Sequence, residues 1–213
     1  MAKKEAGTVK SGRDAILARI RKGLKPGGEL ERPSATRPAV DRASAGRRFI
    51  DKIKAVSATA AVVEDWSAVG EAIALYLHGS GRELRLSRAP HPELEAISWP
   101  DGMQVSVYQG TNQPDVGLSS AVAGVVETGS VVLVSGPETP TSLNFLSDAH
   151  IVVLPVRRLV LHLEDVWPRL RKRGIGRAVN IITGPSRSAD VEQTLQLGAH
   201  GPRNLHVILV KSS

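Results

Sequence analysis

Hydrophobic and polar positions follow a helical period at the start of the chain. Residues 13–24 place four aliphatic side chains on one helical face and basic side chains elsewhere, which predicts an amphipathic helix. Residues 26–38 contain three prolines and two glycines, which predicts an extended linker. The helix is therefore expected to be tethered, with an apolar stripe that packs on the main body or on another subunit.

From residue 43 onward, segments with helical periodicity alternate with short apolar runs. The pattern predicts helices at 43–55, 66–78, 91–97 and from about 163, and strands at 57–64, 83–87, 103–108, 151–156, 178–183 and 205–210. Strand and helix units in alternation are typical of a mostly parallel sheet with helices on both faces. We therefore predict an α/β fold.

Two segments interrupt this alternation. Within 116–136, the apolar runs 121–126 and 131–134 predict a hairpin with a Thr-Gly turn, although a short helix over 119–126 fits the same small residues. After Gly184-Pro185, the pattern predicts a capped helix of about ten residues that ends at Gly198. Its N-cap would be Ser186 or Ser188.

The positive charge of the chain is concentrated at its start. The net charge is +7, yet residues 1–56 hold 15 of the 28 basic and 6 of the 21 acidic residues, which leaves residues 57–213 slightly acidic. A short basic arm binds phosphate backbones without sequence preference. Because only 3% of the residues are aromatic, no stacking surface for bases is evident, and a nucleic-acid partner is not expected.

Composition also limits the chemistry of this chain of 213 residues. It has no cysteine, which excludes disulfides, thiolate nucleophiles and cysteine-ligated clusters within the chain. No pair of histidines has metal-ligand spacing, so we predict no metal site, and the sequence identifies no cofactor. The first residues lack an apolar signal core and no run approaches about 18 apolar residues, so we expect a cytoplasmic protein with no membrane partner.

Candidate ligand-binding residues cluster in two turns near the end of the chain. A strand followed by a loop and a helix start attracts anions, and the planar fork of Arg187 suits a carboxylate or phosphate beside Ser186. In the second turn, a histidine that accepts protons near neutral pH precedes a guanidinium. We therefore predict ligand contacts at Gly184, Ser186, Arg187, Asp190, Gly201 and Arg203, and a catalytic role for His200. Asp190 also has a simpler explanation, as an acidic residue in the first turn of a helix.

Glu127 is the second candidate catalytic residue. It lies between the two apolar runs of 121–134 and precedes Thr128 and Gly129, which we predict to contact a ligand. The carboxylate is either exposed at a turn or partly buried in a state suited to acid–base or covalent chemistry. His206 alternates into a strand and is expected to be a packed residue.

Three motifs together carry a family resemblance. The segments "VVETGSVVL" (125–133), "LSDAHIVVLPVRRLV" (146–160) and "ITGPSRSADVEQTLQLGAHGPRNLHVILV" (182–210) resemble the lactate-utilisation protein C family, the LutC/YkgG or LUD-domain proteins. The helix and proline-rich linker at the start are also similar to that family. We therefore assign residues 1–40 to a basic N-terminal helix and linker, and residues 41–213 to a LUD (LutC-like) α/β domain.

The resemblance implies both a fold and a function. The fold would be of the NagB/RpiA/CoA transferase-like type, and the function would be participation in a bacterial system that oxidises L-lactate to pyruvate with iron–sulfur partner proteins. By motif, it also draws attention to His150, Pro185, Glu192 and Gly198. Three hypotheses follow: a subunit of lactate oxidation that binds a small carboxylate or phosphate, a stand-alone CoA transferase-like or sugar-phosphate isomerase-like enzyme that uses Glu127, and an assembly protein or homo-oligomer.

Overall fold

The computed structural model describes residues 12–23, 37–110, 112–189, 195–197 and 200–212. The chain divides into two compact units, residues 1–37 and 38–213. In the first unit, α1 (Gly12–Gly23) confirms the predicted amphipathic helix, and none of its side chains is buried. Most of the predicted linker lies outside the described residues. Across the described ranges, no helix has both the length and the apolar character needed to cross a membrane.

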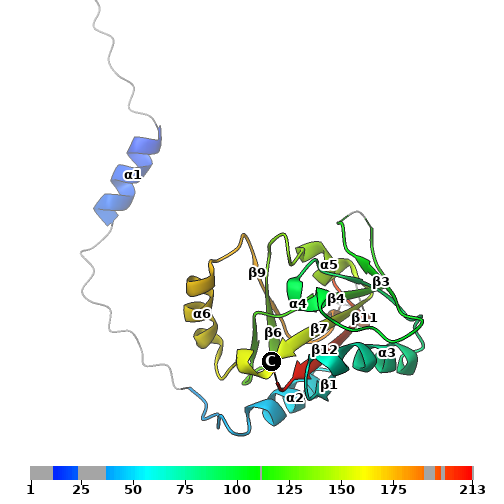
Figure 1. The fold of residues 1–213 in the computed structure, drawn as a ribbon. Coiled ribbons are helices and arrows are strands. Elements are labelled where there is room, and N and C mark those ends of the chain that lie inside the picture. The colour runs from blue at the N-terminus through cyan, green and yellow to red at the C-terminus, as the bar shows by residue number, and fades with distance from the viewer. Residues whose placement is uncertain (1–11, 24–36, 111, 190–194, 198–199, 213) are drawn as a thin grey trace, which may run out of the picture. The chain divides into compact units, whose positions relative to one another are not determined.

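Six parallel strands form the main sheet of the second unit, which confirms the predicted α/β class (Figure 1). Seven-residue β7 and β12 lie near its middle, and every residue of β7 is buried. The order across the sheet is β1 (Thr59–Val63), β12 (Asn204–Val210), β7 (Ala149–Pro155), β4 (Val116–Ser120), β2 (Arg85–Arg88) and β3 (Gln104–Val107).

Helices cover this sheet on opposite faces. Alternate residues of a strand point to opposite faces, and in β12 Ile208 belongs to the core beneath α3 (Val69–Gly79) while Val207 belongs to the core beneath α2 (Ala45–Ala55). Phe49 and Ile53 are the fully buried anchors of α2. The short helices are α4 (Pro92–Glu95) and α5 (Thr141–Leu146), and the 3-10 turn η1 (Trp66–Ala68) leads into α3.

A second, four-stranded sheet packs beside α2. Its order is β8 (Leu159–Val160), β5 (Ala123–Val125), β6 (Ser130–Val134) and β9 (Val179–Ile182). The antiparallel pairing of β5 with β6 confirms the predicted hairpin, and the alternative helix over 119–126 is wrong. Residues 126–129 connect the two strands, so the turn is longer than the two residues predicted. A separate apolar core joins this sheet to α6 (Val166–Arg173), which follows η3 (Leu163–Asp165).

The helix predicted after Gly184-Pro185 is wrong. β10 (Arg187–Ala189) pairs antiparallel with β11 (Leu195–Leu197), with Arg187 opposite Leu197. The Leu-Gln-Leu alternation of 195–197 fits a strand period as well as a helical one, because a three-residue run does not separate the two. Ser186 and Ser188 therefore have no helix to cap at this position.

Candidate functional site

Glu127 forms a close acid–base contact with a histidine. Its Oε2 lies 2.5 Å from Nδ1 of His162. The Glu127 side chain is 24% exposed and that of His162 is 10% exposed. Because β5 pairs with β8, the residue that follows β5 lies beside the residues that follow β8, and the Glu127 N–H donates to the Leu161 carbonyl. The carboxylate is therefore held against an imidazole while part of it reaches solvent.

His162 is itself fixed by the turn that follows β8. Its backbone N–H donates to the Asp165 carboxylate at 3.1 Å, at the start of η3. An imidazole hydrogen-bonded to a partly exposed carboxylate is a common acid–base arrangement. Sequence reasoning did not select His162, because it lies 35 positions from Glu127. The sequence contains one signal for His162, which is that it is a single polar residue between Leu161 and Leu163.

A chain of hydroxyl groups connects the Glu127 turn to the Gly184 loop. Thr128 Oγ1 lies 2.6 Å from Ser130 Oγ, which lies 2.6 Å from Thr183 Oγ1. Thr183 directly precedes Gly184. The structure thus brings together two of the predicted segments, 127–129 and 184–186, which are far apart in sequence.

Gly129 packs against the last turn of α2, and Gly184 packs against Val56, which directly follows α2. Gly129 has a φ of +72°, and a Cβ there would lie 2.7 Å from Lys52 Cβ and 2.9 Å from the Ile53 nitrogen. Gly184 has a φ of +92°, and its Cβ would lie 2.9 Å from the Val56 carbonyl oxygen. Both positions are left-handed and crowded, so glycine is required there by the fold. Ligand contacts at these two glycines stay a prediction.

The loop at 184–186 touches the turn at 200–203. The Ser186 N–H donates to the Pro202 carbonyl at 2.8 Å, and a Cβ on Gly201 would lie 3.4 Å from Ser186 Cβ. Since this turn leads into β12, the loop lies at the amino ends of the parallel strands. The sequence predicts that the strand before this loop belongs to the parallel sheet. This prediction is wrong, because β9 pairs antiparallel with β6 in the second sheet.

Arg203 contributes to a network of ion pairs at the amino ends of the parallel strands. Its Nε lies 3.3 Å from Asp148 Oδ1, and its side chain is 64% exposed. Arg82 binds the same Asp148 at 2.6 Å and Asp115 at 2.7 Å, and donates to Asn204 Oδ1. These contacts fasten the starts of three strands together. The ligand role of Arg203 stays a prediction beside this structural one.

The remaining predicted residues have fewer contacts. Arg187 and His200 are exposed. Asp190, Glu192 and Gly198 lie outside the described residues. Within the described part of the chain, no group of three or more histidine and acidic residues has a geometry that would hold a metal ion.

A second polar cluster, which sequence reasoning missed, lies at the carboxyl ends of the parallel strands. Glu93 accepts from Ser120 Oγ at 2.9 Å and pairs with Arg158, whose Nη1 also donates to the Ala121 carbonyl. Burial raises the pKa of Glu93, but the hydrogen bond from Ser120 and the charge of Arg158 outweigh it and lower that pKa overall. The connections after β2 and β4 leave in opposite directions, and ligands of α/β sheets collect at such a point.

Comparison with known proteins gives the family. The LUD domain family model matches residues 46–210, which is most of the chain. The chain belongs to the LUD domain family. A crystal structure of a DUF162 family protein from Deinococcus radiodurans aligns with a TM-score of 0.59 over 81% of this chain and 99% of that one. Because the two sequences are only 22% identical, this match supports the fold alone.

Curated relatives of this LUD domain protein align over part of their length. The uncharacterized protein NMB1437 of Neisseria meningitidis is 34% identical over 98 residues, 45% of this chain and 42% of the relative. Lactate utilization protein C of Halalkalibacterium halodurans is 34% identical over 110 residues, 49% of this chain and 48% of the relative. The protein of that name in Bacillus subtilis is 32% identical over 103 residues, 46% of this chain and 43% of the relative. The chain thus spans about half the length of these relatives.

Proposed function

We propose that this LUD domain protein takes part in the oxidation of L-lactate to pyruvate, as a subunit that carries no cluster and works with iron–sulfur partner proteins. The proposal is supported by the lactate utilization protein C relatives at 32–34% identity. Oxidation of a 2-hydroxy acid to a 2-oxo acid releases two electrons and two protons. Because the chain has no cysteine, the electrons would pass to cluster-bearing partners.

The observation that carries a chemical role for this chain is the contact of Glu127 with His162. The pair would accept the hydroxyl proton of the substrate, since an imidazole hydrogen-bonded to a carboxylate is a common general base. The substrate carboxylate would bind at the 184–186 loop and the 200–203 turn, where Ser186, Arg187, His200 and Arg203 are the predicted contacts. The hydroxyl chain from Thr128 to Thr183 connects the two places.

Growth on L-lactate as the sole carbon source tests this function. A strain without the gene should fail to grow, and the wild-type gene should restore growth. Glu127→Gln and His162→Ala should not restore it, because general acid–base catalysis contributes about 100-fold or more to the rate. Glu95→Gln changes an exposed carboxylate on α4 and serves as the matched control, which should restore growth. Normal growth of the deletion strain would remove the proposal.

A second candidate function is a stand-alone CoA transferase-like or sugar-phosphate isomerase-like enzyme. It is favoured by the 24% exposure of the Glu127 side chain, which leaves the carboxylate open to an acyl donor. Purified protein incubated with acyl-CoA donors should then carry an adduct at Glu127, detectable by mass spectrometry. The absence of both adduct and turnover would count against this alternative.

A further inference from the structure

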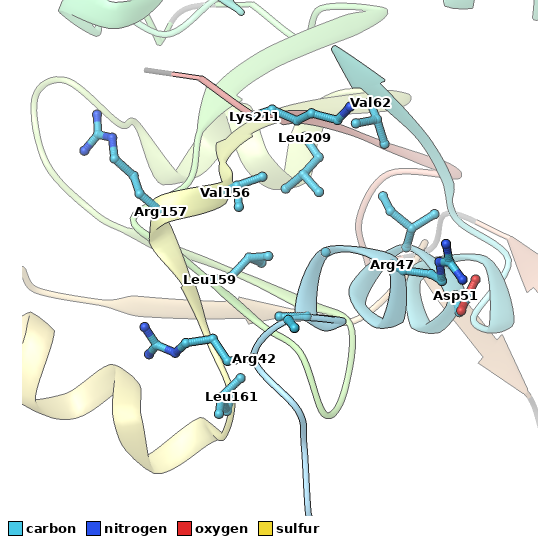
Figure 2. A pocket seen from close by; sticks show the side chains of 14 residues that line it. Arg42, Arg47, Asp51, Val62, Val156, Arg157, Leu159, Leu161, Leu209 and Lys211 are labelled. Carbon is cyan, nitrogen blue, oxygen red and sulfur yellow. The ribbon is translucent and has the colours of Figure 1, made fainter. Parts of the chain in front are cut away.

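A cavity of about 640 Å³ lies between the first half of α2 and the carboxyl ends of β1, β7 and β12 (Figure 2). Its volume falls within the range of about 300–1,000 Å³ that is usual for small-molecule sites. The lining residue nearest in sequence to the Glu127–His162 pair is Leu161, and neither Glu127 nor His162 lines it. The cavity therefore adjoins the candidate site through Leu161, whose carbonyl accepts from the Glu127 N–H, but neither member of the pair lines it.

The floor of the cavity is aliphatic. Figure 2 shows Val156, Leu159 and Leu209 gathered between the strands and α2, and Val62 and Leu161 complete the apolar lining. Gly46 of α2 faces this floor, because a Cβ there would lie 3.8 Å from Leu209 Cδ2. Aliphatic surface of this kind favours a ligand with an apolar body, since its burial releases water from both partners.

The rim of the cavity is cationic. Arg42, Arg47, Arg157 and Lys211 line it, against one acidic residue, Asp51. Lys211 is paired with Glu64 at 2.6 Å, and Arg157 lies 3.7 Å from Glu93. Arg42 and Arg47 stand on either side of the start of α2 at Ala45.

Further positive charge lies next to this rim. Arg169 donates to the carbonyls of Arg157 and Arg158, so guanidinium groups are crowded here. Burial lowers the pKa of Arg169, and the charges of Arg158, Arg157 and Arg42 lower it further. Like charges held this close attract an anion.

The first turn of α2 adds to the positive potential. It contains no acidic residue, and Ser44 does not cap it with its side chain. The Ser44 hydroxyl donates to the Asp41 carbonyl at 3.1 Å instead. The Asp41 carboxylate, which accepts from the Ala43 N–H at 3.1 Å, offsets the positive end of the helix dipole in part from outside α2.

We propose that this cavity binds a small organic anion with an apolar body, its charged group at the cationic rim beside the start of α2 and its body packed on Leu159 and Leu209. The apolar floor excludes a purely inorganic anion as the best ligand, and the cationic rim disfavours a neutral one. The site does not depend on the proposed role in lactate oxidation, and it makes no use of Glu127.

Binding of 8-anilinonaphthalene-1-sulfonate, an aromatic sulfonate that fluoresces in apolar surroundings, tests the proposal on the full chain. We expect saturable binding at one site per chain. Octanoate should displace the dye at concentrations at least about tenfold lower than 1-octanol, because a hydrogen bond to a charged group is stronger than one between neutral groups. Inorganic phosphate alone should displace it poorly.

Three substitutions locate the site. Arg42→Glu and Arg47→Glu should each weaken octanoate binding about tenfold, and Val62→Trp should abolish dye binding by filling the cavity from a position that is 48% exposed. Arg171→Glu, an equal charge change at an exposed position of α6, should leave binding unchanged. Circular dichroism should show that each variant is folded.

Several results would overturn the proposal. The first is that the wild type shows no saturable dye binding. The second is that octanoate and octanol displace the dye equally. The third is that Arg171→Glu weakens octanoate binding as much as Arg47→Glu does. Should Val62→Trp fail to fold, the two arginine variants still decide the outcome.

Discussion

Gly129 illustrates how a single residue near the candidate site is fixed by its neighbours. Replacing it with alanine should lower the free energy of unfolding by about 2–4 kcal/mol. About 1–2 kcal/mol comes from the left-handed backbone, whose φ is +72°, and the rest from the clash with α2 at 2.7–2.9 Å. Urea unfolding of the wild type and the variant measures the difference.

Gly79→Ala is the matched control for this measurement. Gly79 ends α3 and an added Cβ would meet no atom within 4 Å, so the change should alter the free energy of unfolding by less than about 1 kcal/mol. If Gly129→Ala were as stable as the wild type, the turn would have changed its backbone conformation at little cost, and packing against α2 would not fix it.

Single residues also show where prediction from sequence stops. Glu127 could be selected from its place between two apolar runs, but His162 could not, because only the pairing of β5 with β8 brings it near. Ser120 ends β4 and Arg158 lies just after β7, yet their shared partner Glu93 depends on the strand order. Side-chain partners across strands depend on topology, which local periodicity does not encode.

At the scale of elements, most of the predicted segments are present in the structure, and the elements that prediction missed are short. The helices at 43–55 and 66–78 and the strand at 205–210 match α2, η1 with α3, and β12. The strand β4 was not separated from the hairpin that follows it, α5 was missed, and β10 and β11 were predicted as a helix. A run of three to six residues carries less than two turns of helical period, so tertiary packing decides its structure.

Two central strands each bury a histidine, and this makes stability depend on pH. His150 of β7 is fully buried, which lowers its pKa to about 3, and His206 of β12 is mostly buried, which lowers its pKa to about 4, as expected for a packed residue stacked on Tyr76. Below pH 6.5 the unfolded chain binds protons at these positions while the folded chain does not. Stability should therefore fall as pH falls from 6.5 toward 4, by up to about 1.4 kcal/mol per pH unit for each histidine.

Urea unfolding at several pH values between 7 and 5 measures this slope. His150→Gln and His206→Gln should each flatten it, whatever they do to stability at pH 7. His78→Gln changes a histidine at an exposed position of α3 and should keep the wild-type slope. A slope unaltered by either buried substitution would contradict the assignment.

At the scale of the whole molecule, the two ends of the parallel strands carry different groups of side chains. The predicted loops lie at the amino ends of the strands, with the Arg203–Asp148–Arg82 network. The Glu93 cluster and the cavity lie at the carboxyl ends. The sequence alone could not show at which end of the parallel strands each group lies. The strand that precedes Gly184 has the same apolar pattern as the parallel strands but belongs to the second sheet.

The second unit should fold without the first. Residues 38–213 contain the three apolar cores found among the described residues. A chain that lacks residues 1–37 should unfold within about 2 °C of the full chain in a thermal melt, since surface changes seldom exceed about 0.5 kcal/mol. The same truncation tests whether α1, in which Ile16 is 60% exposed, recruits a partner protein.

A full-length variant without the apolar stripe distinguishes the effect of losing that stripe from the effect of shortening the chain. Ile16→Asp with Ile20→Asp keeps the length of the full chain and should melt at the same temperature. In a pulldown with partner proteins, unchanged capture by both the truncated and the double variant would argue against assembly through α1. A melting temperature lowered by many degrees on truncation would show that the second unit is not self-sufficient.

The outermost strands of the main sheet are short. β1 has five residues and β3 has four, against seven in β7 and β12. Unpaired backbone groups on an open strand invite another chain to extend the sheet, and short outer strands limit how many hydrogen bonds such an extension gains. Self-association of this protein by sheet extension would therefore be weak, and a stable dimer would have to be built from side-chain surfaces instead.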